Sequence, residues 1–396
     1  MVKPASNKEA GVATAKDVKE DVTMKFIVER EPLIDAVNWV ARSLSARPMI
    51  TALLGIKIEV GTEIKLTGSN LETSTEAVID ANIQEKGMVL VKGQLLAEIV
   101  RSLPNSTITF TLEGTRVIVS AGTSKFTLPT LEANEYPNLP ALPGAAGDIA
   151  GDEFVKAVNQ VVVAASRDDS LPKFTGVDIQ IKKDKITLAS TDRYRLAIKT
   201  LPWKANNPDL ETSALVRART LSDAAKSLST GSQITLALSP TDSKESLIGF
   251  VSNTKTMTSR TLDESLPSFE HLIPAESKAE ATIEISKLLD SVRRVALVTD
   301  KTLPLILTFA NNTLVLEAGG DQDAQASESI EIQHSGEEIR TGYNPTFLID
   351  GLQALDAPFV HFSFTASNKL AVLTGKPELD GARDESYKYL LNPMRL

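Results

Sequence analysis

The sequence contains no cysteine and only three histidines, His271, His334 and His361, among its 396 residues. The absence of cysteine excludes disulfides, thiolate nucleophiles and zinc–thiolate sites. The histidines are far apart and form no HExxH pattern, so a histidine-rich metal centre is excluded and Ser-His-Asp chemistry would depend on one of the three. No apolar run reaches the roughly 18 residues that a membrane span requires. We therefore expect no metal, no cofactor and no membrane association.

The charge balance is also informative, because 42 basic and 51 acidic residues give a net charge of −9. This excludes a uniformly basic nucleic-acid coat but allows positive charge to gather on one face. At about 150 residues per domain, the length suggests two or three domains. Residues 1–22 are rich in Lys, Glu, Ala and Val and contain no aromatic residue, which predicts a disordered N-terminal extension rather than a secretory signal. We expect a cytoplasmic protein.

The chain repeats one pattern three times. Three segments, Phe26–Leu44, Gly151–Ser166 and Ile283–Val298, each combine a short strand or turn with apolar residues at helical spacing. Each is followed by two alternating strands separated by a polar turn, and alternation with period two is typical of a half-buried antiparallel sheet. The first strands of these pairs are Gly55–Val60, Gly176–Ile181 and Leu305–Phe309.

A second helix follows in each repeat, at Lys92–Leu103, Arg219–Leu228 and Asn344–Leu355. The spacing is regular, since Leu95 to Leu221 is 126 residues and Leu221 to Leu348 is 127. More strands complete each repeat. The sequence therefore predicts three α+β units with the approximate order β-α-β-β-β-α-β-β-β. We place their boundaries at 23–143, 144–275 and 276–396, with Pro- and Ala-rich linkers between them.

Open sheet edges constrain how three such units assemble. Each unit is expected to be a sheet with two helices on one face, and its exposed edges can be covered by pairing with the next unit. Three units joined edge to edge make an arc, which either closes on a second copy or grows into a filament. Closure gives a six-unit ring with helices on one wall and sheets on the other.

Four segments resemble the bacterial sliding clamp, the beta subunit of DNA polymerase III. They are MKFIVERE at Met24–Glu31, ARP at Ala46–Pro48, STDRYRLA at Ser190–Ala197 and YLLNPMRL at Tyr389–Leu396. The resemblance covers about residues 24–396, and the RDD-LP segment at Arg167–Pro172 is similar to actinobacterial clamps. It implies a head-to-tail homodimeric ring, with antiparallel sheets outside and two helices per unit inside, that encircles duplex DNA.

The resemblance also implies a role and partners. The family member is a processivity factor in DNA replication without enzymatic activity. A clamp loader opens it and places it on DNA, which it contacts through the backbone and independently of base sequence. The DNA polymerase III alpha subunit and other proteins dock on it through short peptides. The matching positions for the peptide-binding pocket are Phe174, Thr191, Tyr194, Arg195, Leu196, Pro267, Leu272, Asn344, Phe347, Leu390, Asn392 and Met394.

The residue types suit such a pocket, because Leu, Phe, Met and Pro can form an apolar slot for a Leu or Phe anchor. Arg195 and Asn344 can bond the peptide's backbone or polar side chains. Read without the resemblance, Leu196, Leu272 and Leu390 are ordinary core residues. Asn392 departs from the family, which usually has an apolar residue there, and Phe174 occupies a position that is often Leu. We expect the amide to shrink the apolar patch or to offer a new hydrogen bond.

The remaining carried-over residues concern DNA and the dimer. The DNA contacts match Arg47, Arg101, Arg219, Lys226 and Arg293. The dimer interface joins the first unit to the third, with opposite charges at the two ends favouring head-to-tail contact. Its matching residues are Lys125, Leu128, Leu297, Asp321, Asp323 and Glu328.

Two other functions remain open at this point. One is a hydrolase or transferase with a divalent-metal site at Asp321, Asp323 and Glu328, although the segment lacks the glycine and glutamate of an EF-hand loop. The other is a filament-forming scaffold that uses the same repeat without closure. Neither a G-x-G-x-x-G, a P-loop nor a G-x-S-x-G motif occurs.

Overall fold

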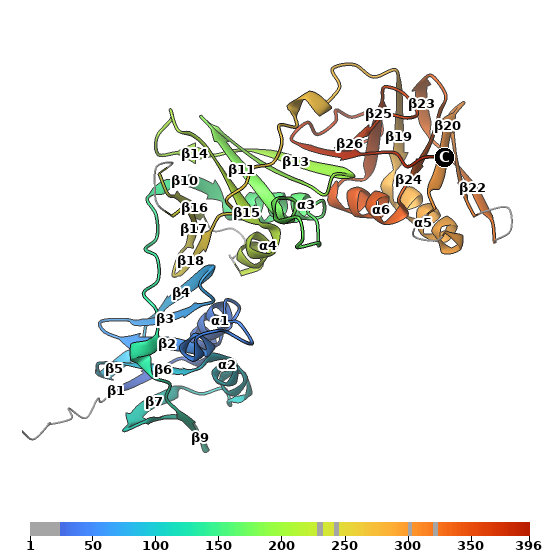
Figure 1. Ribbon diagram of the computed structural model, residues 1–396. Helices are drawn as coiled ribbons and strands as arrows, with labels where there is room; N and C mark the ends of the chain where they lie inside the picture. Colours follow the sequence, from blue (N-terminus) through green and yellow to red (C-terminus); the bar gives the residue numbers. More distant parts are fainter. Residues whose placement is uncertain (1–23, 228–232, 241–244, 300–302, 320–323) are drawn as a thin grey trace, which may run out of the picture.

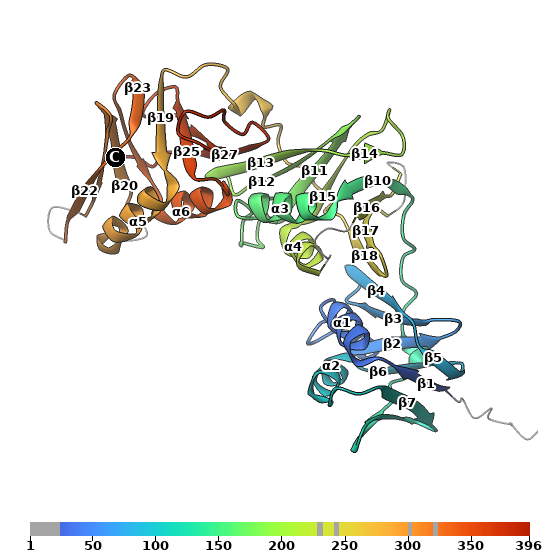
Figure 2. The same cartoon turned by 180° about the vertical axis from the view of Figure 1, so that it is seen from behind.

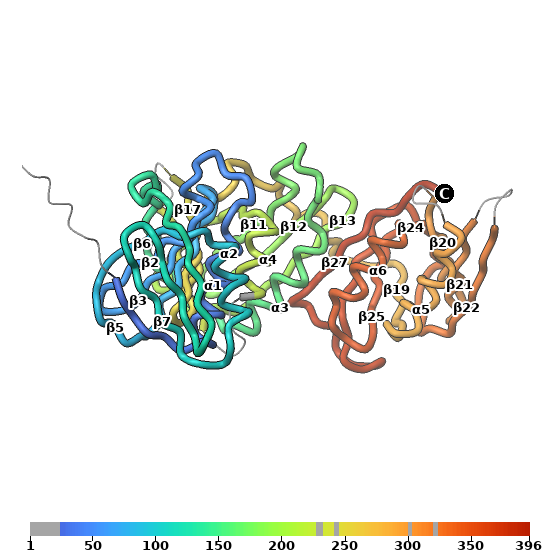
Figure 3. The backbone as a smooth tube through the Cα atoms, turned by 90° about the horizontal axis from the view of Figure 1, so that it is seen from below, coloured from blue at the N-terminus to red at the C-terminus, as the bar shows by residue number. Residues whose placement is uncertain are grey.

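The computed structural model describes residues 24–227, 233–240, 245–299, 303–319 and 324–396. The chain forms three successive α+β units arranged as an arc, with the helices on its concave side and the strands on its convex side (Figure 1). The view from behind shows the same two layers (Figure 2). Seen from below, the second unit lies between the first and the third (Figure 3). The predicted three-fold α+β repeat is confirmed. The predicted extension at residues 1–22 lies outside the described residues.

The units share one order of elements. The first contains β1 Met24–Val28, α1 Arg30–Ala41, β2 Gly55–Val60, β3 Ile64–Ser69, β4 Thr73–Ile79, β5 Asn82–Glu85, β6 Gly87–Lys92, α2 Gly93–Ser102, β7 Ile108–Glu113, β8 Arg116–Ala121 and β9 Ser124–Pro129. The second contains β10 Ala145–Ala150, α3 Gly151–Val162, β11 Gly176–Lys182, β12 Lys185–Thr191, β13 Arg195–Pro202, β14 Lys204–Ala205, β15 Glu211–Arg217, α4 Ala218–Ser227, β16 Gln233–Leu238, β17 Leu247–Ser252 and β18 Lys255–Arg260. The third contains β19 Ala279–Glu284, α5 Ile285–Val295, β20 Leu305–Ala310, β21 Thr313–Ala318, β22 Ala326–Glu331, β23 Gln333–Gly336, β24 Ile339–Tyr343, α6 Pro345–Ala354, β25 Phe359–Phe364, β26 Ala371–Lys376 and β27 Tyr387–Leu391.

Within the described residues, five strands separate the two helices of each unit, where the sequence predicted three. In the first unit, β4 ends at Ile79 and the chain continues after two residues as β5, which pairs with β1 rather than with the sheet of β4. The chain therefore crosses from one sheet to another inside each unit. Each unit contributes strands to two sheets instead of forming the single sheet that the alternation indicated.

Two of the four sheets run across unit boundaries. One nine-stranded sheet has the order β14-β10-β16-β17-β18-β4-β3-β2-β6 and joins the second unit to the first through β18 and β4. The other has the order β15-β11-β12-β13-β27-β26-β25-β19-β23 and joins the second to the third through β13 and β27. The five-stranded sheet β5-β1-β7-β8-β9 and the four-stranded sheet β22-β21-β20-β24 lie at the two ends of the arc (Figure 1).

The helices bury one face each, as the apolar spacing predicted. In α1 the residues Leu33, Val37 and Val40 are almost fully buried, and they follow one another at three- and four-residue intervals. Only the second helix of the first unit differs from the predicted spacing, by one position. Leu95 is 41% exposed, and its neighbour Leu96 is the buried counterpart of Leu221 and Leu348. Among the described residues, no helix has both the length and the apolar character needed to cross a membrane.

The core of the first unit predicts the size of one substitution. Phe110 is fully buried on β7 and stacks on Phe26, with ring centroids 4.7 Å apart. Because Phe110→Ala removes this contact and leaves a cavity, we expect the unit to lose roughly 3–5 kcal/mol of stability. Urea unfolding followed by Trp39 fluorescence, in a Trp203→Phe background, measures this unit. The half-buried Thr111→Ala on the same strand is the control, and an equal shift in both variants would contradict the packing argument.

Candidate functional site

The junction between the second and third units brings together pocket residues that are far apart in the sequence. Strands β13 and β27 pair antiparallel, and this register places Leu196 directly opposite Leu390. Both leucines belong to a small apolar cluster that is separate from the main core. This cluster also contains Ala189, Ile198, Phe269 and Val372. Leu196 and Leu390 are only 5% and 3% exposed, so they form the floor of this region.

A second apolar cluster lies beside the first. Phe174 packs with Leu215 and Leu266, and Leu171 and Leu262 lie at its margin. The segment that links the second unit to the third connects the two clusters, because Leu266 enters one and Phe269 enters the other. Pro267 lies between these two residues in the chain and is exposed, as is Leu272. The apolar character expected of the pocket is therefore present on both sides of the linker.

Arg195 is the polar centre of the junction. Its guanidinium donates to Asp192 Oδ2 at 2.9 Å and to Asp350 Oδ2 at 2.7 Å, and Nη1 lies 3.4 Å from the Tyr389 hydroxyl. Although burial opposes the charge, Tyr389, Asp350 and Asp192 raise the pKa of Arg195. This side chain therefore ties β13 to α6 and β27. None of these three partners was among the residues selected from the sequence; Asp192 and Tyr389 stood next to selected residues, Thr191 and Leu390, whereas Asp350 did not.

An aromatic surface extends outward from Arg195. The guanidinium lies 4.2 Å from the ring centroid of Phe347, and that ring lies 6.3 Å from the ring of Tyr194. Tyr194 is 56% exposed, which makes it the outermost of these groups. Thr191 supports the turn beneath it, because its hydroxyl donates to the Arg195 carbonyl at 2.6 Å. These contacts place the predicted aromatic and polar pocket residues on one continuous surface.

Three polar or flexible residues complete the site. The backbone N–H of Asn392 donates to the Tyr194 carbonyl at 2.9 Å, and its side-chain amide donates to the Arg193 carbonyl at 3.1 Å. Met394 donates from its backbone to Gly342. Asn344 differs from expectation, since its Oδ1 caps α6 by accepting from Thr346 and Phe347. Its side chain is engaged in helix capping rather than held out for a ligand.

Four of the five residues predicted to contact DNA lie on helices of the concave face (Figure 1). Arg101 is on α2, Arg219 and Lys226 are on α4, Arg293 is on α5, and Arg47 lies in the loop after α1. Each of them is exposed. Several cations of this face form ion pairs within the chain, since Lys156 pairs with Asp356 and Arg294 pairs with Glu328, and Arg293 itself lies 3.7 Å from Asp290. The concave face thus carries accessible positive charge in a protein of net charge −9.

The four predicted dimer residues within the described ranges lie at the two ends of the arc. Lys125 is exposed on the edge strand β9, and Leu297 is 84% exposed just after α5. Leu128 is instead buried in the core of its own unit, because alternation along β9 turns it inward. Glu328 lies on the edge strand β22, where hydrogen bonds from Arg294 and Ser291 hold its pKa at about 2. Asp321 and Asp323 lie outside the described residues.

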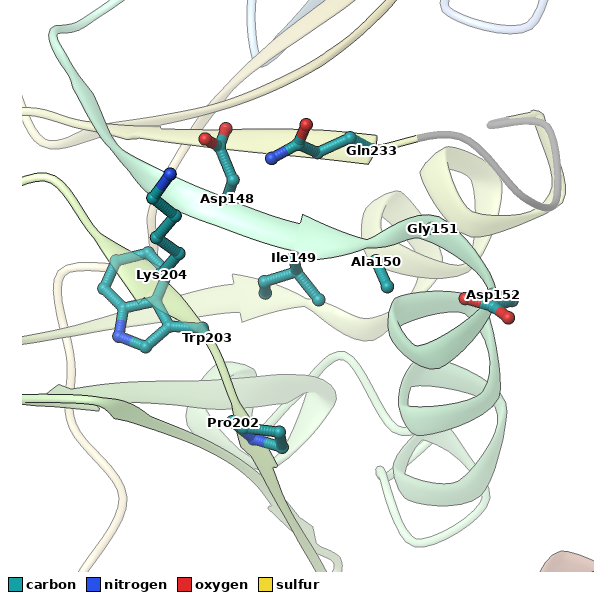
Figure 4. Close-up of a pocket in the computed structure, with 9 residues that line it drawn as sticks. All are labelled: Asp148, Ile149, Ala150, Gly151, Asp152, Pro202, Trp203, Lys204 and Gln233. Atoms are coloured by element: carbon teal, nitrogen blue, oxygen red, sulfur yellow. The ribbon is translucent and has the colours of Figure 1, made fainter.

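Within the described ranges no group of three His, Cys, Asp or Glu could hold a metal ion; Asp321 and Asp323, two of the three residues of the predicted metal alternative, lie outside those ranges. A separate surface hollow of about 500 Å³ lies on the second unit, between β10, Trp203 and the start of α3 (Figure 4). Its polar groups are engaged locally: Asp148 accepts from Thr235 at 2.6 Å, and the Trp203 indole donates to Lys183 at 3.0 Å. The hollow lies away from the junction and carries no catalytic arrangement.

Repeated units joined by continuous sheets, a helix-lined concave face and an apolar docking surface are characteristic of the DNA-clamp class of proteins. Family models of the DNA polymerase III beta subunit match in three parts: the N-terminal domain at 24–140, the central domain at 148–268 and the C-terminal domain at 270–395. The chain belongs to the DNA polymerase III beta subunit family, the beta sliding clamps. These proteins are non-catalytic processivity subunits in DNA replication, with DNA and polymerase as partners.

Individual relatives agree with this assignment. The chain is 47% identical to the beta sliding clamp of Streptomyces coelicolor over 94% of this chain and 100% of that protein. It is 41% identical to the beta sliding clamp homolog GriR of Streptomyces muensis, over 94% of this chain and 99% of that one. The crystal structure of the DNA polymerase III subunit beta of Pseudomonas aeruginosa matches in fold, with a TM-score of 0.86, 24% identity and coverage of 94% and 100%. The actinobacterial character predicted from the sequence is confirmed.

The contacts of Arg195 predict the cost of removing its charge. Arg195→Met leaves Asp192 and Asp350 without their cation at the junction of two units, so we expect a loss of roughly 2–5 kcal/mol. Urea unfolding followed by Trp203 fluorescence in a Trp39→Phe background measures the second unit. Arg340→Met, which removes a pairing with Glu317 on the exposed side of the third unit, is the matched control. A midpoint unchanged relative to this control would show that the buried pairs do not stabilise the junction.

Proposed function

We propose that this clamp works as a head-to-tail homodimeric ring around duplex DNA, placed there by a clamp loader, and that the junction surface docks peptides of the polymerase alpha subunit and other proteins. The observation that carries the proposal is that both internal junctions use one strand register, while the matching strands at the two ends of the arc are unpaired within the described chain. The ring is the arrangement in which the third junction repeats the first two.

The common register follows from equivalent hairpins. Phe250↔Met257, Leu373↔Tyr389 and Val119↔Phe126 are matching pairs in the last hairpin of each unit. Leu66↔Ala77, Leu188↔Lys199 and Leu316↔Glu328 are matching pairs in the middle hairpins. At the first junction Met257 lies opposite Thr75, and at the second Tyr389 lies opposite Ala197. Thr75 precedes Ala77 by two residues, and Ala197 precedes Lys199 by two residues. The two internal junctions therefore have the same register.

Applied to the free edges β9 and β22, this register places Phe126 opposite Ala326 of a second copy and Ser124 opposite Glu328. Phe126 is 36% exposed, whereas its counterparts Met257 and Tyr389 are almost fully buried at the internal junctions. The ring of Phe126 is therefore exposed at the position where Met257 and Tyr389 are covered by a neighbouring unit. Leu297 lies at the same end of the arc as β22 and can extend the apolar contact.

Charges at the junctions support the same closure. The fifth residue after the start of α1, Asp35, pairs with Lys255 of the second unit at 2.8 Å. The equivalent residue of α3, Lys156, pairs with Asp356 of the third unit at 2.9 Å. The equivalent residue of α5 is Asp290, which lies at the open end of the third unit. On β9 the counterpart of Lys255 is Ser124, and Lys125 is the next residue. We propose that Asp290 and Lys125 of the second copy approach one another, which disfavours pairing of like ends.

Duplex DNA suits the face that such a ring encloses. Arg47, Arg101, Arg219, Lys226 and Arg293 are exposed there, and cations on helices and loops bind phosphates without reading base sequence. The net negative charge of the whole protein repels the duplex elsewhere, which favours loose enclosure over tight adhesion. We propose these five residues as the DNA contacts.

The peptide-docking role rests on the surface formed by Leu196, Leu390, Tyr194, Phe347 and Pro267. Its buried leucine floor and exposed aromatic rim suit an apolar anchor residue. We propose domain limits of 23–143, 144–275 and 276–396, supported by the breaks between the three repeats of strands and helices. A cytoplasmic location follows from a role on chromosomal DNA.

Closure is tested by Phe126→Asp. The substitution places a carboxylate at the centre of the proposed contact and opposite the acidic end of the third unit, so the ring is expected to dissociate. Light scattering at micromolar concentration should give a mass near twice 42.6 kDa for the original protein and near 42.6 kDa for the variant. Met49→Asp, at a fully exposed methionine away from both edges, is the control. A dimer that survives Phe126→Asp would refute the proposed register.

Enclosure of DNA is tested by Arg47→Ala. Loss of one phosphate contact should shorten the retention time on nicked circular DNA equally for all base sequences, and lower the salt slope by about one. Lys185→Ala, on the convex face, should have no effect. Retention that depends on base sequence, or an unchanged slope, would be inconsistent with a backbone contact by Arg47.

A further inference from the structure

The first helix of the first unit begins with a cation that its own helix does not favour. Arg30 is the first residue of α1, and a positive charge at a helix N-terminus opposes the helix dipole. Its side chain is nevertheless only 20% exposed, so it is not simply directed into solvent. The physical reason for an arginine at this position therefore lies outside α1.

The partner of Arg30 is the C-terminal end of α2, which lies beside α1 on the concave side of the arc (Figures 1 and 2). Arg30 Nε donates to the Leu103 carbonyl at 2.9 Å, and Nη2 donates to the Arg101 carbonyl at 2.9 Å. Nη1 donates to Glu31 Oε1 at 2.5 Å. Each nitrogen of the guanidinium thus already donates within the chain, which makes Arg30 a cap for α2 rather than a free cation.

Such a cap matters because α2 is short and ends abruptly. The helix covers 10 residues, Gly93–Ser102, and Pro104 prevents its continuation. The last four carbonyls of a helix have no partner within it and need one elsewhere. Arg30 bonds the carbonyl of Arg101 in the last turn and that of Leu103 directly after it. At this end of α2 the positive charge of Arg30 also agrees with the helix dipole.

Arg101, one of the proposed DNA contacts, belongs to this last turn. Its side chain is exposed, and its Nε donates to the Ala97 carbonyl at 3.0 Å, which directs the guanidinium along the helix. The backbone of the same residue is the one that Arg30 bonds. The cap therefore fixes the point from which the Arg101 side chain extends toward a ligand.

The other two units offer an internal comparison. The residues that match Arg101 in the other second helices are Lys226 and Gln353, at the same distance from the buried leucines. The first residues of α3 and α5, which match the first residue of α1, are Gly151 and Ile285. Neither has a side chain that can donate a hydrogen bond, so this cap is particular to the first unit.

We propose that Arg30 is a positioning residue for DNA binding: by capping α2, it fixes the place where Arg101 meets a phosphate of the duplex backbone. The inference rests on the proposed DNA contact by Arg101. A guanidinium on a helix end that is already ordered loses less conformational freedom on binding than one on a fraying turn. Arg30 acts through Arg101 and does not itself bind the phosphate.

The test is the affinity for a short fluorescein-labelled linear duplex, measured by fluorescence anisotropy over a range of salt concentrations. A linear duplex can leave the ring freely, so its affinity reports the phosphate contacts. Arg101→Met should weaken binding roughly fivefold at low salt and lower the salt slope by about one. Arg30→Met should weaken binding roughly threefold in the original protein, and should change nothing further in the Arg101→Met background.

Three controls separate positioning from charge and from overall stability. In a Lys226→Met background, Arg30→Met should still weaken binding by the same factor, because Lys226 belongs to another unit. Arg30→Lys keeps the charge, but its single ammonium cannot bond two carbonyls as the planar guanidinium does, so most of the loss should remain. In Arg30→Met the amides in the last turn of α2 should exchange hydrogen faster, while those of α3 exchange as before. If Arg30→Met does not fold, Arg30→Lys replaces it in the same backgrounds.

The outcomes are distinguishable. A loss from Arg30→Met that persists in the Arg101→Met background would overturn the inference, and so would an Arg30→Met variant that binds DNA as the original protein does. Arg30→Lys with undiminished affinity would also overturn it, because charge alone would then explain the contribution of Arg30. If Arg101→Met changes neither the affinity nor the salt slope, the proposed DNA contact fails and this inference fails with it.

Discussion

Backbone pairing across unit boundaries is the constraint on which this structure depends. A sheet edge presents unpaired N–H and C=O groups that need hydrogen-bond partners. At each internal junction an edge strand of one unit pairs with an edge strand of the next. Two nine-stranded sheets result, and they fix the angle between units because strands cannot pair at arbitrary orientations. The helices then lie on one side of the arc as a consequence, since each helix pair packs against the inner face of the sheets that the strands define.

The proposed docking surface depends on the same junctions. Leu196 and Leu390 come from different units and meet only because β13 and β27 pair in one register. Arg195 reinforces this meeting with bonds to α6 and β27, so a polar network stabilises the place where the apolar floor is assembled. A partner that docks here contacts two units at once. Assembly of the arc and formation of the site are therefore one event rather than two.

Much of the fold could be predicted from the sequence, because the repeat constrains it three times over. The buried face of α1 followed directly from residues such as Leu33 and Val37. The extra strands of each unit were missed because the break between β4 and β5, at Asp80 and Ala81, carries no glycine or proline. The sequence pattern predicted Leu95 rather than Leu96 as the buried residue, because two adjacent leucines fit the same helical period. Only packing in the folded protein decides which one is buried.

The site was less predictable for physical reasons. Asp350 lies 155 residues from Arg195, so nothing in the local sequence connects the two charges. Asn344 could have been identified as a cap, since an asparagine directly before a proline is a typical helix start. The hydrogen bond from Asn392 to the Arg193 carbonyl could not be predicted, because it depends on the left-handed backbone of Arg193, and that conformation belongs to the folded turn. Sequence patterns indicated residues for the proposed surface but not the hydrogen bonds between them.

The edge strand β9 ends in Pro129, which has no N–H to offer a neighbouring strand. A chain laid along this edge can pair over a few residues only, and any longer ladder stops there. The open end of the arc is consequently a poor template for extended β-aggregation, even though one phenylalanine stands exposed on it. Specificity at this end therefore depends on a ladder of a few residues together with side chains such as that of Phe126, and such a contact can form and come apart without the breaking of many hydrogen bonds.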